Sequence, residues 1–271
     1  MRKQTELLQS RTRVKARYAL IPLEGVPYSR LSEWPAARVQ ILAAPALGAA
    51  FTEYRLELDA GAAGEHQSDG EIEHFVFILS GEARLTLTGG RGVVGFTGDA
   101  SSHHTALGPH TLGAGGYALI PPSYGYRIEA AGDTTLLLLR KRYETAPGIE
   151  EFAPVIADEG DVAGEVYMGD EGALLQTLIP DEFAFDMAMN IFTFETGHSL
   201  PVTETHVMEH GLYVLAGKGL YYLDDTWMEV EASDFIWMGP FCPQSYYATG
   251  PTATRYLYYK NVNREIPLAE H

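Results

Sequence analysis

HFVFILSGEARLTL (residues 74–87) and HGLYVLAGKGLYYL (residues 210–223) are two copies of one pattern: a histidine, an apolar run, a glycine and a second apolar run. β-Branched and aromatic residues dominate both runs, and this composition is typical of strands. Downstream, GGYALIPPSYGYRIEAAGDTTLLLLRK (115–141) resembles SDFIWMGPFCPQSYYATGPTATRYLYYK (233–260), which aligns Pro121 with Pro240 and Lys141 with Lys260. Self-similarity over this length indicates that the chain contains the same β unit twice.

The spacing between matched positions reveals an insertion in the first unit, and the linker between the units predicts the domain boundaries. It falls from 136 residues at the histidines to 119 at the prolines, so the first unit carries an extra 17 residues, within the Gly- and His-rich stretch 92–115. That composition predicts a loop. Helical periodicity is confined to short pieces, so we expect an all-β chain of two barrels or sandwiches. The linker falls near 145–154, which predicts domains at 1–152 and 153–271.

Composition limits the classes of partner. Of 271 residues, 46% are hydrophobic, which predicts a packed globular protein, and the formal net charge of −17 disfavours nucleic acid as a partner. The basic run from Arg2 to Arg17 is interpreted as a solvated arm. Cys242 is the single cysteine, so no intrachain disulfide can form, and no apolar stretch is long enough for a membrane span. We expect a cytoplasmic protein without a membrane partner.

A candidate metal site precedes the second repeat. If residues 204–210 are extended, Glu204, His206 and His210 point to one face and Glu209 to the other. Two imidazoles and a carboxylate suit Mn, Fe or Zn. Gln244, at the start of a later strand, could add an amide oxygen, which favours Mn over Zn.

The first repeat serves as a comparison. With the glycines of the repeat aligned, His74 matches His210, but Gly70, Ser68 and Gly125 stand in place of the other three candidate ligands, so the first domain is predicted to hold no metal. Five further histidines are interpreted as solvated loop residues: His66, His103, His104, His110 and His198.

These motifs resemble those of cupins, whose barrels are jelly rolls of the double-stranded β-helix type. The second cupin motif reads Ser233-Asp-Phe-Ile-Trp-Met-Gly-Pro240, with Gln244 where a histidine is usual. The set E-x-H-x-x-x-H, a later Gln, and Y-L-x-Y-K-x-x-N-R (256–264) resemble the bicupin (S)-ureidoglycine aminohydrolases over almost the whole chain.

The resemblance implies a manganese enzyme that converts (S)-ureidoglycine and water to (S)-ureidoglycolate and ammonia in the breakdown of allantoin and purines. Its metal ligands would be Glu204, His206, His210 and Gln244, and its substrate-binding residues Tyr221, Gln244, Tyr256 and Lys260. Lys260 and Glu204 are the candidate catalytic residues.

The residues alone leave other functions open. Strand alternation places Lys260 on the face of Tyr256 and Tyr258, but a strand-end lysine is often a solvated charge and tyrosines are often core residues. Two histidines and a carboxylate also serve cupin dioxygenases with non-haem iron, and a third possibility is a non-catalytic small-molecule-binding bicupin. Exposed strand edges favour a homo-oligomer.

Overall fold

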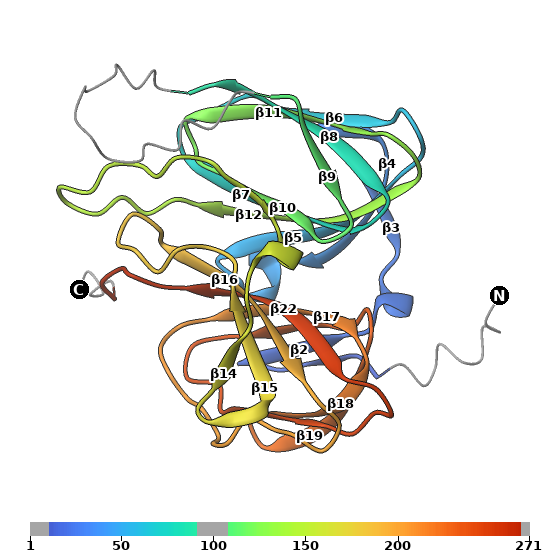
Figure 1. Ribbon diagram of the computed structural model, residues 1–271, viewed down its shortest axis with the longest axis vertical. Helices are drawn as coiled ribbons and strands as arrows, with labels where there is room; N and C mark the ends of the chain where they lie inside the picture. Colours follow the sequence, from blue (N-terminus) through green and yellow to red (C-terminus); the bar gives the residue numbers. More distant parts are fainter. Residues whose placement is uncertain (1–10, 91–107, 267–271) are drawn as a thin grey trace. The chain divides into compact units, whose positions relative to one another are not determined.

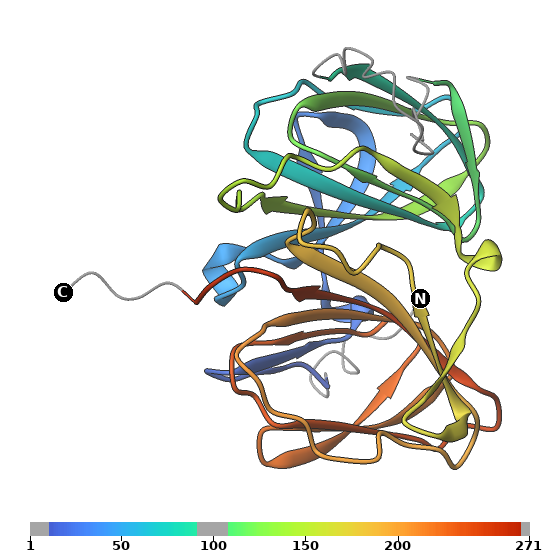
Figure 2. The same cartoon turned by 60° about the vertical axis from the view of Figure 1, so that its left-hand side comes forward.

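The computed structural model describes residues 11–90 and 108–266. Strands dominate these ranges, together with short 3₁₀ helices at Leu23–Gly25, Pro45–Leu47 and Glu159–Asp161. No helix in the described part of the chain is long and apolar enough to span a membrane. The chain divides into two compact units, each made of two β-sheets (Figures 1 and 2).

Among the described residues, the first unit comprises 28–41, 50–90 and 108–161. One sheet has seven strands in the order β13-β10-β7-β12-β5-β4-β3, and the other has four in the order β6-β11-β8-β9. The strands are β3 (Tyr28–Leu31), β4 (Trp34–Ala43), β5 (Phe51–Leu58), β6 (Ala63–His66), β7 (Ile72–Ser80), β8 (Glu82–Gly89), β9 (His110–Gly113), β10 (Gly116–Ile120), β11 (Tyr124–Ala130), β12 (Thr134–Arg142) and β13 (Val155–Asp158).

Side chains of both sheets form the core of this unit. Val76 and Leu138 come from the larger sheet, and Leu85 and Ile128 from the smaller one; all four are fully buried. Alternate residues of each strand point into this layer, as strand geometry requires. The repeat 74–87 therefore forms β7 and β8, one strand in each sheet.

Among the described residues, the second unit comprises 11–27, 42–49 and 162–266. Its sheets have the orders β1-β2-β20-β17-β22-β16-β15-β14 and β19-β18-β21. The strands are β1 (Arg13–Val14), β2 (Tyr18–Ile21), β14 (Glu165–Tyr167), β15 (Asp170–Thr177), β16 (Met187–Phe194), β17 (His210–Ala216), β18 (Lys218–Leu223), β19 (Thr226–Glu231), β20 (Phe235–Met238), β21 (Gln244–Ala248) and β22 (Thr254–Asn261). The core again lies between the sheets, with Leu212 and Ile236 from one and Leu223 and Tyr246 from the other.

The predicted boundaries, 1–152 and 153–271, differ from these units. β2 pairs with β20, so the first strands of the chain complete the sheet of the second unit. β13 pairs with β10, so the first unit continues to residue 161. Such pairings join residues distant in sequence, and a local composition change cannot reveal them.

Two segments that were predicted to be irregular, 92–115 and 2–17, are only partly described by the structure. In the insertion 92–115, residues 92–107 are not described, but His110–Gly113 forms β9 against β8, where a loop was expected. In the basic run 2–17, the described residue Arg11 bonds the buried carboxylate of Asp234, so this part of the run is structural and not a solvated arm.

Candidate metal centre

The predicted ligands do not lie on one continuous strand. His210 is the first residue of β17, whereas residues 205–209 have no regular structure, and Glu204 forms an isolated bridge with Gln244. The expected alternation over 204–210 is therefore not the cause of the convergence. The bridge and the start of β17 together position these side chains.

Two imidazoles and an amide converge closely. His210 Nε2 lies 3.1 Å from His206 Nε2, and Gln244 Nε2 lies 3.1 Å and 3.4 Å from these two atoms respectively. Burial lowers the pKa of His206, and the positive charge of Lys260 lowers it further. Burial, then the charges of His206 and Lys260, hold the pKa of His210 well below its usual value. Both rings are therefore neutral at neutral pH.

The tautomers direct lone pairs toward one point. His206 Nδ1 lies 3.2 Å from the carbonyl oxygen of Met208 and donates to it, and His210 hydrogen-bonds the backbone of Tyr259. A neutral imidazole that donates from one nitrogen presents a lone pair at the other. Two lone pairs 3.1 Å apart repel each other unless a proton or a metal ion lies between them. This donor set fits a divalent metal ion.

Gln244 can supply an oxygen to the same point. The hydroxyl of Tyr221 donates to Gln244 Oε1 at 3.0 Å, while the amide nitrogen faces the two rings. A half-turn of the amide would direct Oε1 at the rings and leave the nitrogen to donate to the phenol oxygen, since a hydroxyl also accepts. Both groups are nearly fully buried, at 3% and 2% exposure.

Glu204 is held by a tyrosine. Its Oε1 accepts a hydrogen bond of 2.9 Å from the hydroxyl of Tyr167. Burial, followed by this carboxylate, raises the pKa of Tyr167 to about 12, so the phenol stays a donor. In residues 11–90 and 108–266, no group of three or more His, Cys, Asp and Glu side chains is already spaced to hold a metal ion. Metal ligation by Glu204 thus stays a prediction, in which Tyr167 orients the carboxylate.

A cavity of about 80 Å³ adjoins these groups. Its lining contains the predicted residues Glu204, His210, Tyr221, Gln244, Tyr256 and Lys260, together with Tyr167 and Tyr258. The predicted alternation of Tyr256, Tyr258 and Lys260 along β22 is confirmed, because all three line the cavity. Burial raises the pKa of Tyr221 and Tyr256 well above the usual value, so both hydroxyls remain protonated.

Sequence reasoning missed Tyr167. It lies on β14, outside every motif, and reaches the cavity only because β14 pairs with β15 at the edge of the sheet. Glu209 was expected to point away, and it does not line the cavity. Its carboxylate accepts from Trp237 Nε1 at 3.1 Å instead.

Strand register corrects the alignment of the two repeats. Leu223 and Leu87 occupy the same position in the two repeats. In the second unit Leu223 pairs with Gln244, which pairs with Glu204. In the first unit Leu87 pairs with Tyr126, which pairs with His66. Tyr126 and His66, and not Gly125 and Ser68, therefore occupy the positions of the amide and carboxylate. Similarly, Lys260 pairs with His210 and Arg140 with His74, so Arg140, not Lys141, matches the lysine.

The interpretation of His66 as a solvated loop residue is wrong. It ends β6, is 5% exposed, and its ring lies 4.3 Å from that of His74 between centroids. His198 is half-exposed and bonds Asp170 at 2.7 Å, and His110 lies on β9. His103 and His104 are outside the described residues.

Comparison with known proteins identifies the family. A rice protein (Oryza sativa subsp. japonica) named "Probable (S)-ureidoglycine aminohydrolase" is 34% identical over 260 residues, covering 94% of this chain and 76% of its own. The (S)-ureidoglycine aminohydrolase of Escherichia coli strain K12 is 31% identical over 270 residues, covering 97% and 95%. No protein-family model matches the chain.

Solved structures agree in fold. A Pseudomonas aeruginosa structure has a TM-score of 0.83 at 33% identity, covering 97% of this chain and 94% of that one. A cupin 2 conserved barrel domain protein from Leptotrichia buccalis, 15% identical, has a TM-score of 0.57, covers 92% and 99%, and supports the fold alone. The predicted pair of cupin jelly-roll barrels is confirmed, and the chain belongs to the (S)-ureidoglycine aminohydrolase family.

Proposed function

We propose that this protein hydrolyses (S)-ureidoglycine to (S)-ureidoglycolate and ammonia, a step of allantoin and purine breakdown. The observation that carries the proposal is the convergence of His206, His210 and Gln244 beside a cavity in a chain of this family. In the reaction, a C–N bond breaks and a C–O bond forms at the same carbon. One proton of the attacking water leaves with the amine as ammonia, so no oxidant is needed.

We further propose Mn²⁺ as the metal, held by His206, His210, Gln244 and Glu204. Carboxylate and amide oxygens are hard ligands, and they suit Mn²⁺ better than Zn²⁺, which favours tetrahedral sites. When bound, the ion would supply Lewis-acid and template effects at the reacting carbon. The two neutral imidazoles complete the set with nitrogen donors.

Lys260 binds and orients the substrate in this proposal. It lines the cavity, and it pairs with His210 across β17 and β22. Its Nζ would pair with the substrate carboxylate, give one proton to the departing amine and regain one from the attacking water. The carboxylate of Glu204 would share in handling that proton.

Two protonated tyrosines complete the binding of substrate. Tyr221 and Tyr256 present hydroxyls that can donate to the ureido oxygen, because their raised pKa values keep them neutral. Carboxylate, ureido group and amine are then fixed at three points, which is the minimum that distinguishes the two hands of the substrate carbon. Phe192 and Leu212 form apolar parts of the wall and limit the entry of further water.

An anaerobic ammonia-release assay on freshly generated ureidoglycine tests the proposal. We expect activity that chelation removes and added Mn²⁺ restores, without oxygen consumption. Oxygen-dependent turnover would instead indicate a dioxygenase. His206→Ala should lose metal and activity with an unchanged melting temperature, whereas His198→Ala, a half-exposed histidine of the same barrel, should keep both.

We also propose that the protein acts in the cytoplasm as a homo-oligomer with a small-molecule substrate as its ligand. The support for self-association is the edge strand β14, next to which Met168 is 65% exposed and on which Val166 is 51% exposed. Size-exclusion chromatography with light scattering at several concentrations is the test, and a monomer at every concentration would contradict it.

A further inference from the structure

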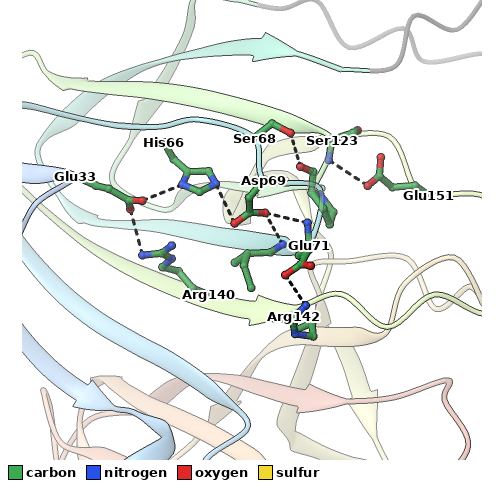
Figure 3. Close-up of polar contacts among 11 residues, drawn as sticks. Glu33, His66, Ser68, Asp69, Glu71, Ser123, Arg140, Arg142 and Glu151 are labelled. Carbon is green, nitrogen blue, oxygen red and sulfur yellow. Dashed lines mark hydrogen bonds and ion pairs between the residues drawn. The ribbon is translucent and has the colours of Figure 1, made fainter.

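A histidine in the first barrel is oriented by a carboxylate. His66 Nδ1 lies 3.1 Å from Glu33 Oε1, and Arg140 lies 3.1 Å from the other carboxylate oxygen (Figure 3). The hydrogen bond from His66 lowers the pKa of Glu33, burial opposes this, and the charge of Arg140 lowers the pKa further, so the carboxylate accepts the Nδ1 proton. The second ring nitrogen, Nε2, then carries a lone pair. Metal-bound histidines commonly have this carboxylate partner.

Buried polar atoms around this ring have no well-formed hydrogen bond. Among the described residues, His66 Nε2, both ring nitrogens of His74 and the hydroxyl of Tyr126 lack such a partner, although the backbone of Ile72 lies near His74. These side chains are 5%, 0% and 1% exposed. Unsatisfied buried polar groups are costly and call for a ligand or an ion.

The rings are arranged as in the second barrel. The centroids of His66 and His74 are 4.3 Å apart at an interplanar angle of 48°, compared with 4.9 Å and 46° for His206 and His210. The ring of Tyr126 lies 5.1 Å from that of His74 and 5.7 Å from that of His66.

A carboxylate oxygen lies close to the free nitrogen. Asp69 Oδ1 accepts hydrogen bonds of 2.9 Å from the backbone N–H groups of Glu71 and Ile72, which fixes the side chain. Its Oδ2 is 4.0 Å from His66 Nε2 (Figure 3). A small rotation brings this oxygen to the spacing of two ligands on one ion.

The charges around the site favour a cation. An adjoining cavity of about 610 Å³ is lined by three carboxylates and two guanidinium groups: Glu33, Glu65, Asp69, Arg127 and Arg140. Both arginines already pair with carboxylates, Arg127 with Glu129 and Glu65, and Arg140 with Glu33. An anion would therefore meet a net negative lining, whereas a divalent cation would be stabilised.

We propose that the first barrel binds one divalent first-row transition-metal ion through His66 Nε2, a ring nitrogen of His74 and Asp69 Oδ2. The hydroxyl of Tyr126 and water complete the coordination, and Glu33 positions His66. This site replaces the metal-free first domain inferred from the sequence alignment, which had set Gly125 and Ser68 at the positions of Tyr126 and His66. It is independent of the proposed reaction.

Co²⁺ binding to the full chain tests this site, with bound metal quantified and its visible absorption recorded after chelation and reloading. The wild-type protein should bind two equivalents, and His206→Ala/His210→Ala should retain one. In that background, Asp69→Asn and His66→Gln should each weaken binding at least 10-fold, and Glu33→Gln by about 10- to 100-fold. His198→Gln in the same background is the matched control and should change nothing.

A single equivalent in the wild-type protein that disappears in His206→Ala/His210→Ala would overturn the proposal. So would a second equivalent that Asp69→Asn and His66→Gln leave unchanged. If the double variant does not fold, Asp69→Asn in the wild-type chain decides the question, since Asp69 is a partly exposed loop residue. It should reduce the stoichiometry from two to one, and retention of two equivalents with unchanged affinities would refute the assignment.

Discussion

Tyr167→Phe probes a hydrogen bond that holds the candidate carboxylate ligand. The change removes the 2.9 Å bond to Glu204 Oε1 and leaves the ring, which packs edge-on against Phe192 at 4.8 Å. Hydrogen bonds to charged groups contribute about 1.5–3 kcal/mol, and groups that orient a metal ligand about 10- to 100-fold in affinity. Because Tyr167 is only partly buried, we expect a loss near the lower limit, about 10-fold or 1.4 kcal/mol.

The assay is Mn²⁺ affinity by competition with a chelator, paired with ammonia release over a range of Mn²⁺ concentrations. Turnover should fall at low Mn²⁺ and recover at saturation, because the variant weakens binding of the ion and not the chemistry. Tyr246→Phe is the control, since Tyr246 packs in the same core on Phe194 and bonds none of the proposed ligands. An unchanged Mn²⁺ affinity in Tyr167→Phe would refute the assignment of Glu204 as an oriented ligand.

Other changes test the reaction and the two barrels separately. Lys260→Met should lower kcat by about 10²- to 10⁴-fold at unchanged Mn²⁺ content, as expected for loss of a proton-transfer group; equal loss of metal would make Lys260 structural. Gly64→Ala should destabilise the first barrel by about 1–3 kcal/mol in denaturant unfolding, because the new Cβ would lie 2.2 Å from the ring of Trp34. Arg11→Ala should destabilise the second barrel by about 1–3 kcal/mol, because the 2%-exposed carboxylate of Asp234 loses its cation; an unchanged melting temperature would contradict this.

Each of these variants has a matched control. Lys218→Met removes another strand-end lysine, an exposed one, and should leave kcat unchanged. Gly113→Ala adds a Cβ with no atom within 4 Å and should leave stability unchanged. Arg13→Ala removes an exposed arginine of the same N-terminal segment and should be nearly neutral.

Much of the site could be predicted from the sequence. The exceptions are residues whose role depends on contacts between distant parts of the chain. The three residues of β22 that line the cavity follow from period-2 alternation alone, because a strand presents alternate side chains to one face. Tyr167 and the structural role of Arg11 could not be predicted, because each depends on a side-chain contact between residues far apart in the chain.

The sequence by itself determined the duplicated all-β units, the place of the candidate donors and the family, since these are recorded in local patterns that recur along the chain. Only the tertiary structure decided the strand register, which sets His66 and Tyr126 at positions where alignment had set Ser68 and Gly125. The physical reason is that register is fixed by hydrogen bonds between strands and by packing across two sheets. A shift of one residue moves a side chain to the opposite face of a strand, although the two sequences align almost equally well in either register.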